Sequence, residues 1–110
     1  MNTFIERYDH TINILDDQLS SLIDAGSDFD LEKNGDVLSI IFDDGSKFII
    51  SPNSPVNQLW VSANYEGHRF NYSESEANWS DEKSGQLFTE YLSVLLGEKL
   101  GEAISLHLSS

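Results

Sequence analysis

Acidic side chains are the residues of this sequence whose type and spacing could do chemistry. They recur on the polar side of a helical N-terminal segment, projected at about 100° per residue, and at every second position of the segment that follows. The two sets are Glu6, Asp17 and Asp24, and Asp28, Asp30 and Glu32. If the helix edge and the strand are adjacent, these carboxylates form one acidic ridge, to which Asp36, Asp43 and Asp44 add charge at the end of the sheet.

Such a ridge suits hard cations. Carboxylate oxygens bind Mg²⁺, Ca²⁺ and Mn²⁺, and by the same argument Fe³⁺, with Fe²⁺ bound more weakly. Neighbouring carboxylates on one strand face are about 7 Å apart, too far for one rigid ion to take three of them. The ridge therefore predicts several loosely held ions. The alternative reading is a solvated polar face without a ligand.

Patterns typical of enzymes are absent from the sequence. There is no Glu-x-x-His pair, no His-Glu-x-x-His motif and no glycine-rich phosphate loop. The histidines His10, His68 and His107 are far apart along the chain, and there is no cysteine. Residues 28–32 superficially suggest a calcium loop but lack the glycine and glutamate that such a loop requires. We expect a protein that is not an enzyme.

The charge of the chain limits its partners. There are 19 acidic residues against 6 Lys and Arg, a formal net charge of −13. Such a field repels nucleic acid and anionic membranes and attracts cations and basic protein surfaces. The absence of cysteine fits a reducing compartment, and we expect a cytoplasmic protein because neither a membrane span nor a targeting segment is evident.

Hydrophobic periodicity indicates the elements that must position the ridge. Apolar residues at helical spacing predict helices over 4–23 and 85–99, the second capped by Ser84, with an apolar stripe that includes Val94. Alternation and turn signals, with Pro52 and Pro55 marking a loop, predict the intervening strands. These are residues 28–33, 37–42, 47–51, 58–63, 68–72 and a short sixth strand at 77–80. The tail, 103–108, is apolar enough to pack on the domain.

One apolar stripe on each helix and one apolar face on the sheet predict a two-layer α+β sandwich. Both helices would cover one side of a five- to six-stranded antiparallel sheet in a single domain, residues 1–110, and leave the other side open. Strand alternation places Trp60 on that open side, opposite Leu59 and Val61. Trp60 is then either a partner anchor or a side chain covered by a neighbouring loop.

The sequence resembles the bacterial frataxin (CyaY) family along nearly its whole length. Three stretches carry the resemblance: NGDVL at 34–38, FDDGSKFII at 42–50 and PVNQLWVS at 55–62. Trp79, Asp81, Ser84-Gly85, Phe88 and Leu92 match the entry to the family's last helix. The family's helix–sheet–helix fold agrees with the elements predicted above.

The resemblance implies iron, as Fe²⁺ or Fe³⁺, bound weakly along the ridge, where other divalent cations could substitute. It also implies docking onto a cysteine desulfurase and its iron–sulfur scaffold protein by a chain that is a monomer without metal. Carried over by position, the iron candidates are Asp17, Asp24, Asp28, Asp30 and Glu32, and the partner-binding candidates are Asn57, Gln58 and Trp60. Gln18, Ser20, Ser21 and Gly26 make the ridge sparser than is usual in the family.

Three functions follow from these observations. The leading one is an iron-binding adapter or regulator of iron–sulfur cluster assembly. An iron-storing or iron-oxidising, ferroxidase-type protein is the second, although no fixed ligand set for oxidation is evident. An acidic interaction module without a metal is the third.

Overall fold

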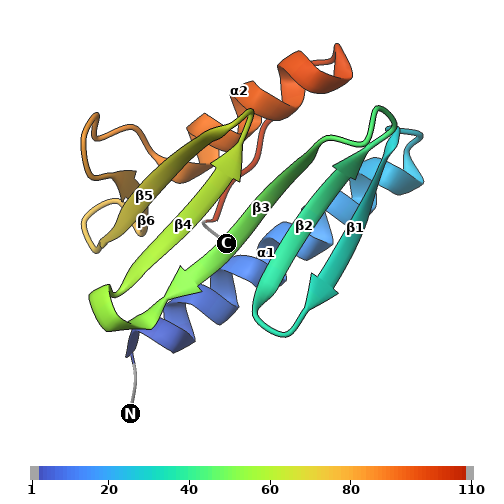
Figure 1. Cartoon of the computed structure of the whole chain (residues 1–110). Coiled ribbons are helices and arrows are strands. Elements are labelled where there is room, and N and C mark those ends of the chain that lie inside the picture. The colour runs from blue at the N-terminus through green and yellow to red at the C-terminus, as the bar shows by residue number, and fades with distance from the viewer. Residues whose placement is uncertain (1–2, 109–110) are drawn as a thin grey trace.

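The computed structural model describes residues 3–108 as a helix, six strands and a second helix in chain order (Figure 1). The elements are α1 (Thr3–Asp24), β1 (Phe29–Asn34), β2 (Val37–Phe42), β3 (Lys47–Asn53), the short 3-10 helix η1 (Ser54–Val56), β4 (Gln58–Ala63), β5 (Glu66–Ser73), β6 (Asn78–Asp81) and α2 (Phe88–Leu100). The predicted helix–strands–helix order, including the short sixth strand, is confirmed.

The sheet is an antiparallel meander in which each strand pairs with the next along the chain. Gly35 and Gly45 lie in the turns that flank β2 with φ of 63° and 87°, the left-handed region that glycine enters without steric cost. The first hairpin brings Phe29 opposite Phe42 and Asn34 opposite Val37. This register decides which carboxylates of the ridge become neighbours.

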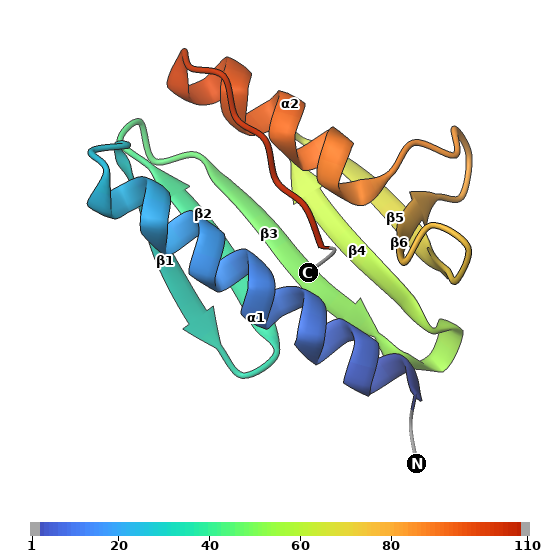
Figure 2. The same ribbon diagram turned by 180° about the vertical axis from the view of Figure 1, so that it is seen from behind.

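Both helices cover the same face of the sheet, and the other face is open, as the two views show (Figures 1 and 2). The layers enclose one core, because alternate residues of the strands point towards the apolar stripes of the helices. Trp79 of β6 is fully buried in it, and its Nε1–H donates to Thr11 Oγ1 of α1 at 2.8 Å. The predicted two-layer α+β sandwich is confirmed.

The tail that follows α2 runs back between the two helices (Figure 2). Leu106 and Leu108 are buried there. Gln18 holds the tail by donating from Nε2 to the carbonyl of His107 at 2.6 Å and accepting its N–H at 3.1 Å. The prediction that this segment packs on the domain is confirmed.

The second helix begins later than predicted, at Phe88, and its N-cap Leu87 makes no capping hydrogen bond. Ser84 is not the cap, because its N–H donates to Asp81 Oδ1 at 3.0 Å within a tight loop. That loop returns Leu87 to pair with Ser80, which keeps residues 84–87 out of the helix. Val94 was wrongly assigned to the buried stripe, since it is 54% exposed.

Pro52 lies in β3 opposite Leu59 rather than in a loop. The pairing of β3 with β2 ends at Ile50, so the missing N–H of Pro52 falls where one neighbouring strand is absent, a position that tolerates proline. Within residues 3–108, no helix has the length and apolar character needed to cross a membrane.

Candidate functional site

The five predicted iron ligands are all exposed and lie along one edge of the molecule, where α1 packs beside the edge strand β1 (Figure 2). Asp17 and Asp24 come from the C-terminal half of α1, and Asp28 from the loop that joins α1 to β1. Asp30 and Glu32 alternate along β1 with Phe29 and Leu31, which pack towards the core. The structure therefore brings these five carboxylates to one edge, whereas Glu6, also predicted for the ridge, lies in the first turn of α1 at the other end of the helix.

Strand pairing brings Asp43 to the same edge of the molecule. It lies in the turn after β2, opposite Asp28, because Phe29 pairs with Phe42. The hydrogen bond that a protonated Asp43 donates to Asp28, then desolvation and the negative charges of Asp28, Asp30 and Asp44, raise the pKa of Asp43. Two carboxyl groups share a hydrogen bond only when one of them is protonated, so the raised pKa of Asp43 reflects the crowding of negative charge at this corner.

The negative charge of Asp44, the next residue, is balanced by an ion pair and by hydrogen bonds. Lys99 Nζ of α2 lies 2.6 Å from its Oδ2, and Ser46 donates to its Oδ1 from both the hydroxyl and the backbone N–H. The Lys99 ion pair and the Ser46 hydrogen bonds lower the pKa of Asp44. Asp36, also predicted to add charge at this end, lies in the β1–β2 turn at the opposite end of β1.

Nothing in residues 3–108 forms a closed metal site from three His, Asp or Glu side chains. Glu32 and Asp30 extend from a single strand face, where spacing of about 7 Å keeps their carboxylates apart. The ridge can hold cations through one or two carboxylates and water, which is the way hard divalent ions bind at low affinity.

Trp60 lies half-buried on the open face of the sheet, opposite the buried Leu59 and Val61, as strand alternation predicted. Its indole is covered by a neighbouring strand rather than by a loop: the Arg69 guanidinium of β5 lies 5.0 Å from the ring centroid. The indole Nε1–H donates to Gln58 Oε1 at 3.0 Å. The aromatic surface is thus held in one orientation with part of it still accessible.

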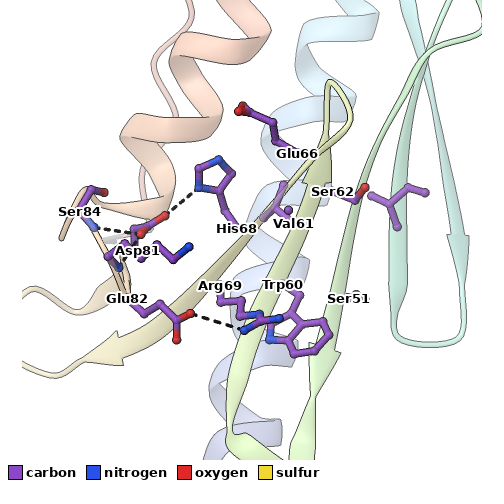
Figure 3. Close-up of a pocket in the computed structure, with 13 residues that line it drawn as sticks. Ser51, Trp60, Val61, Ser62, Glu66, His68, Arg69, Asp81, Glu82 and Ser84 are labelled. Atoms are coloured by element: carbon purple, nitrogen blue, oxygen red, sulfur yellow. Dashed lines mark hydrogen bonds and ion pairs between the residues drawn. The ribbon is translucent and has the colours of Figure 1, made fainter.

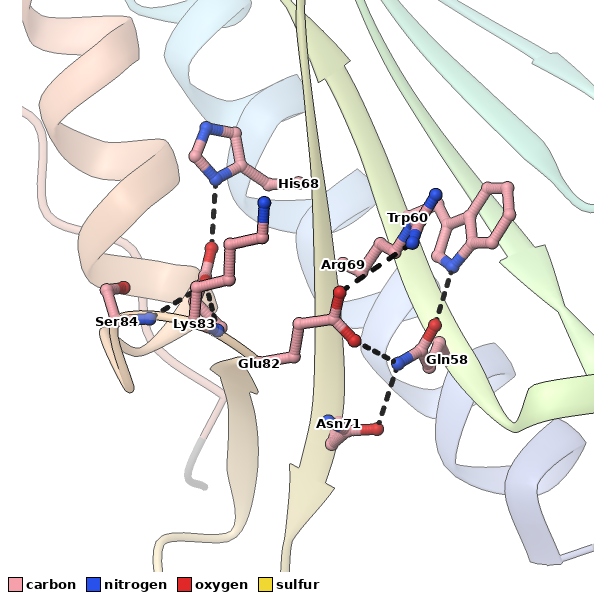
Figure 4. Close-up of polar contacts among 9 residues, drawn as sticks. Gln58, Trp60, His68, Arg69, Asn71, Glu82, Lys83 and Ser84 are labelled. Carbon is pink, nitrogen blue, oxygen red and sulfur yellow. Dashed lines mark hydrogen bonds and ion pairs between the residues drawn. The ribbon is translucent and has the colours of Figure 1, made fainter.

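Gln58 connects Trp60 to β5 and to the residue that follows β6 (Figure 4). Its Nε2 donates to Asn71 Oδ1 of β5 at 3.2 Å and to Glu82 Oε1, just after β6, at 2.9 Å. Glu82 Oε2 lies 3.8 Å from Arg69 Nη1, which closes a ring of polar contacts around the indole. We name these five residues, Gln58, Trp60, Arg69, Asn71 and Glu82, the tryptophan face.

Asn57, the remaining predicted partner residue, is exposed just before β4 in the left-handed conformation, with φ of 53°. Sequence reasoning missed Arg69, Asn71 and Glu82. Alternation could have placed Arg69 and Asn71 on the open face with Trp60, since they are separated from the buried Phe70 by one position. Their pairing opposite Trp60 and Gln58 depends on the register between β4 and β5.

The model of the frataxin-like domain matches residues 1–102 of the chain. The chain belongs to the frataxin-like family. Iron–sulfur cluster assembly protein CyaY of Pseudomonas putida (strain W619) is 35% identical to it over 99 residues, which is 89% of this chain and 90% of that protein. The protein of the same name from Pseudoalteromonas atlantica is 37% identical over 83 residues, covering 72% and 75% of the two chains.

The fold agrees with this membership. The solved structure of frataxin from Psychromonas ingrahamii superposes on the whole chain with a TM-score of 0.84 at 26% sequence identity, and both chains are covered completely. The resemblance predicted from the three sequence stretches is therefore confirmed. These frataxin-like relatives carry the name of an assembly protein rather than of an enzyme.

Proposed function

We propose that this chain is a non-catalytic adapter in iron–sulfur cluster assembly, which binds iron weakly on the acidic ridge and docks onto a cysteine desulfurase and its scaffold protein. The names of the frataxin-like relatives support the pathway. The ridge residues are Asp17, Asp24, Asp28, Asp30 and Glu32, and the docking residues are Asn57, Gln58 and Trp60. The same proposal gives a cytoplasmic protein that is a monomer without metal.

The observation that carries the proposal is that part of the ridge and the tryptophan face share the open side of the sheet. Glu32 pairs with Ser39, Ser39 with Ile49 and Ile49 with Ser62, so one row of outward side chains crosses from β1 to β4. Ser62 is two residues from Trp60 on the same face. A single partner could therefore contact the carboxylates of β1 and the indole of β4 together.

The two parts would contribute differently to that contact. Exposed carboxylates attract a basic partner surface and set the association rate. The partly accessible indole offers a large apolar area whose orientation Gln58 and Arg69 already hold, so little side-chain freedom is lost on binding.

Residue-resolved NMR tests the proposal. Mn²⁺, a hard paramagnetic stand-in for iron, should broaden amide signals next to Asp24, Asp28 and Asp30 before signals of α2. Added desulfurase should instead shift signals around Gln58 and Trp60. Broadening that is evenly distributed over the surface would contradict the ridge. Absence of any shift with the desulfurase would contradict docking.

A measurement of Fe²⁺ oxidation distinguishes the proposed adapter from the ferroxidase alternative. Oxygen consumption is followed after Fe²⁺ is added to the protein and to buffer alone. We expect equal rates, because the ridge holds ions loosely and no ligand set poises them for oxidation. A rate that saturates with Fe²⁺ and is lost on substitution of Asp28 and Asp30 would favour the alternative.

A further inference from the structure

His68 of β5 is the best-oriented imidazole of the chain, and neither the ridge nor the tryptophan face uses it. Its Nδ1 lies 2.9 Å from Asp81 Oδ2. The Asp81 side chain is only 7% exposed, and its other oxygen accepts the backbone N–H groups of Lys83 at 2.7 Å and Ser84 at 3.0 Å.

The contact with the Asp81 carboxylate at Nδ1 selects the tautomer of the ring. The carboxylate accepts the Nδ1 proton, so the neutral imidazole carries its lone pair on Nε2. Aromatic neighbours hold the ring from the side: the Tyr91 ring of α2 is 4.6 Å from it between centroids, and the Phe70 ring 6.4 Å. This is the arrangement that orients metal-binding histidines, in which a carboxylate takes the second ring N–H.

The free nitrogen points away from Asp81, to the side of the ring where Glu66 lies (Figure 3). Glu66 and His68 are two residues apart on β5, so their side chains leave the same face of the strand with Cα atoms about 7 Å apart. Tyr91 of α2 packs against the imidazole on this same side of β5.

The surroundings favour a cation. Glu66 and His68 lie on the wall of an open hollow of about 720 Å³. Its wall carries three carboxylates, Glu66, Asp81 and Glu82, against two cationic side chains, Arg69 and Lys83. These acidic and basic side chains together leave a net negative charge on the wall, and the hollow lies on a chain whose formal charge is −13.

We propose that His68 Nε2 and the Glu66 carboxylate form a second metal site, separate from the ridge, which takes a borderline transition-metal cation with water completing its coordination. Asp81 is the positioning residue of this site. An imidazole nitrogen favours Zn²⁺, Ni²⁺, Cu²⁺ and Fe²⁺ over Mg²⁺ and Ca²⁺, whereas the all-oxygen ridge favours the hard ions. The chain would thus sort cations between two surfaces by ligand type.

The test is titration with Ni²⁺ in excess Mg²⁺, which occupies the ridge, followed by NMR line broadening. We expect broadening centred on residues 66–68 and on Tyr91. His68→Asn should abolish it, and the asparagine amide can still donate to Asp81. Glu66→Gln, on an exposed side chain, should weaken binding about tenfold, and Asp81→Asn by about 10–100-fold, as expected for loss of a group that orients a ligand.

His107→Asn is the matched control, because His107 is exposed and its side chain is not oriented by a carboxylate in the described structure. This variant should bind Ni²⁺ as the wild type does. Broadening centred on His10 or His107, broadening confined to the ridge despite Mg²⁺, or unchanged affinity in both His68→Asn and Glu66→Gln would overturn the proposal. The Mn²⁺ experiment on the ridge is independent of each of these outcomes.

Discussion

Replacement of Trp60 by alanine separates what the tryptophan face contributes to partner binding from what it contributes to folding. In the folded chain the substitution removes a cation–π contact with Arg69 and one hydrogen bond to Gln58. At a half-exposed position these contribute about 0.5–1 and about 0.5–1.5 kcal/mol, respectively. Gln58 keeps its contacts with Asn71 and Glu82, so the free energy of unfolding should fall by about 1–2.5 kcal/mol.

The same substitution should also weaken binding to the partner, and the change should be visible in the rate constants. A tryptophan at the centre of an interface contributes about 2 kcal/mol or more, which corresponds to roughly 30-fold weaker binding. Most of that change should appear as faster dissociation, because removal of an uncharged contact leaves the electrostatic encounter with the partner unchanged.

The assay is a kinetic binding measurement on immobilised desulfurase, paired with thermal denaturation. Tyr65→Ala is the matched control: its ring is fully exposed at the tip of the β4–β5 hairpin, outside the tryptophan face, and its loss should change dissociation less than twofold, about 0.4 kcal/mol. The melting temperature of Trp60→Ala should fall by about 4–8 °C per kcal/mol lost. Unchanged dissociation would refute the docking role, and an unfolded variant would refute the placement of Trp60 outside the core.

Four further predictions concern charge. Replacement of Asp24, Asp28 and Asp30 by lysine should slow association with the desulfurase and weaken the dependence of the association rate on salt, measured by stopped flow. An association rate with the same salt dependence as the wild type would contradict electrostatic steering by the ridge. Salt should raise the melting temperature by screening the ridge, and Mg²⁺ should raise it further by binding the native state; a midpoint that neither moves would argue against crowded charge. Asp43→Asn should raise the free energy of unfolding at neutral pH, measured by urea denaturation. The reason is that the folded-state pKa of Asp43 is raised, so ionisation of this carboxyl costs stability as the pH rises through that pKa. The gain from the substitution should shrink towards pH 4, and an equal gain at both pH values would count against the crowding of Asp43. Asp81→Ala should cost about 1–3 kcal/mol at neutral pH by leaving the N–H groups of Lys83 and Ser84 unpaired. Because the folded-state pKa of Asp81 is lowered, the part of this stability cost that depends on its negative charge should vanish as the pH falls through that pKa. A cost that does not change with pH would refute the stabilising role of the Asp81 charge.

The elements and their layering could be predicted from the sequence because their signals are local. Apolar residues of α1 recur at 3.6-residue spacing, and all its buried positions fall on that stripe. Alternation in β4 likewise assigns Leu59 and Val61 to the core and Trp60 to the open face before any neighbour is known. Local prediction was wrong where a non-local contact competes, as at the start of α2, which the Ser80–Leu87 pairing delays.

The candidate sites likewise combine features that one segment predicts with contacts that form only in the folded chain. Exposure of the ridge carboxylates follows from their positions in one helix and one strand. The partnering of Asp43 with Asp28, and of Asp44 with Lys99, follows from turns and helices that meet only in the folded chain. No spacing in the sequence distinguishes the crowded Asp43 from the neutralised Asp44 beside it.

The net charge follows directly from the composition, and the alternating carboxylates of β1 and the face on which Trp60 lies follow from the backbone period of one strand each. Which side chains meet depends on the folded chain, as with Gln58 and Glu82, and His68 and Asp81. The reason is that strand register is set by hydrogen bonds between strands that meet only in the folded chain, and a slip of one residue in one strand would send the side chains of that strand to the opposite face.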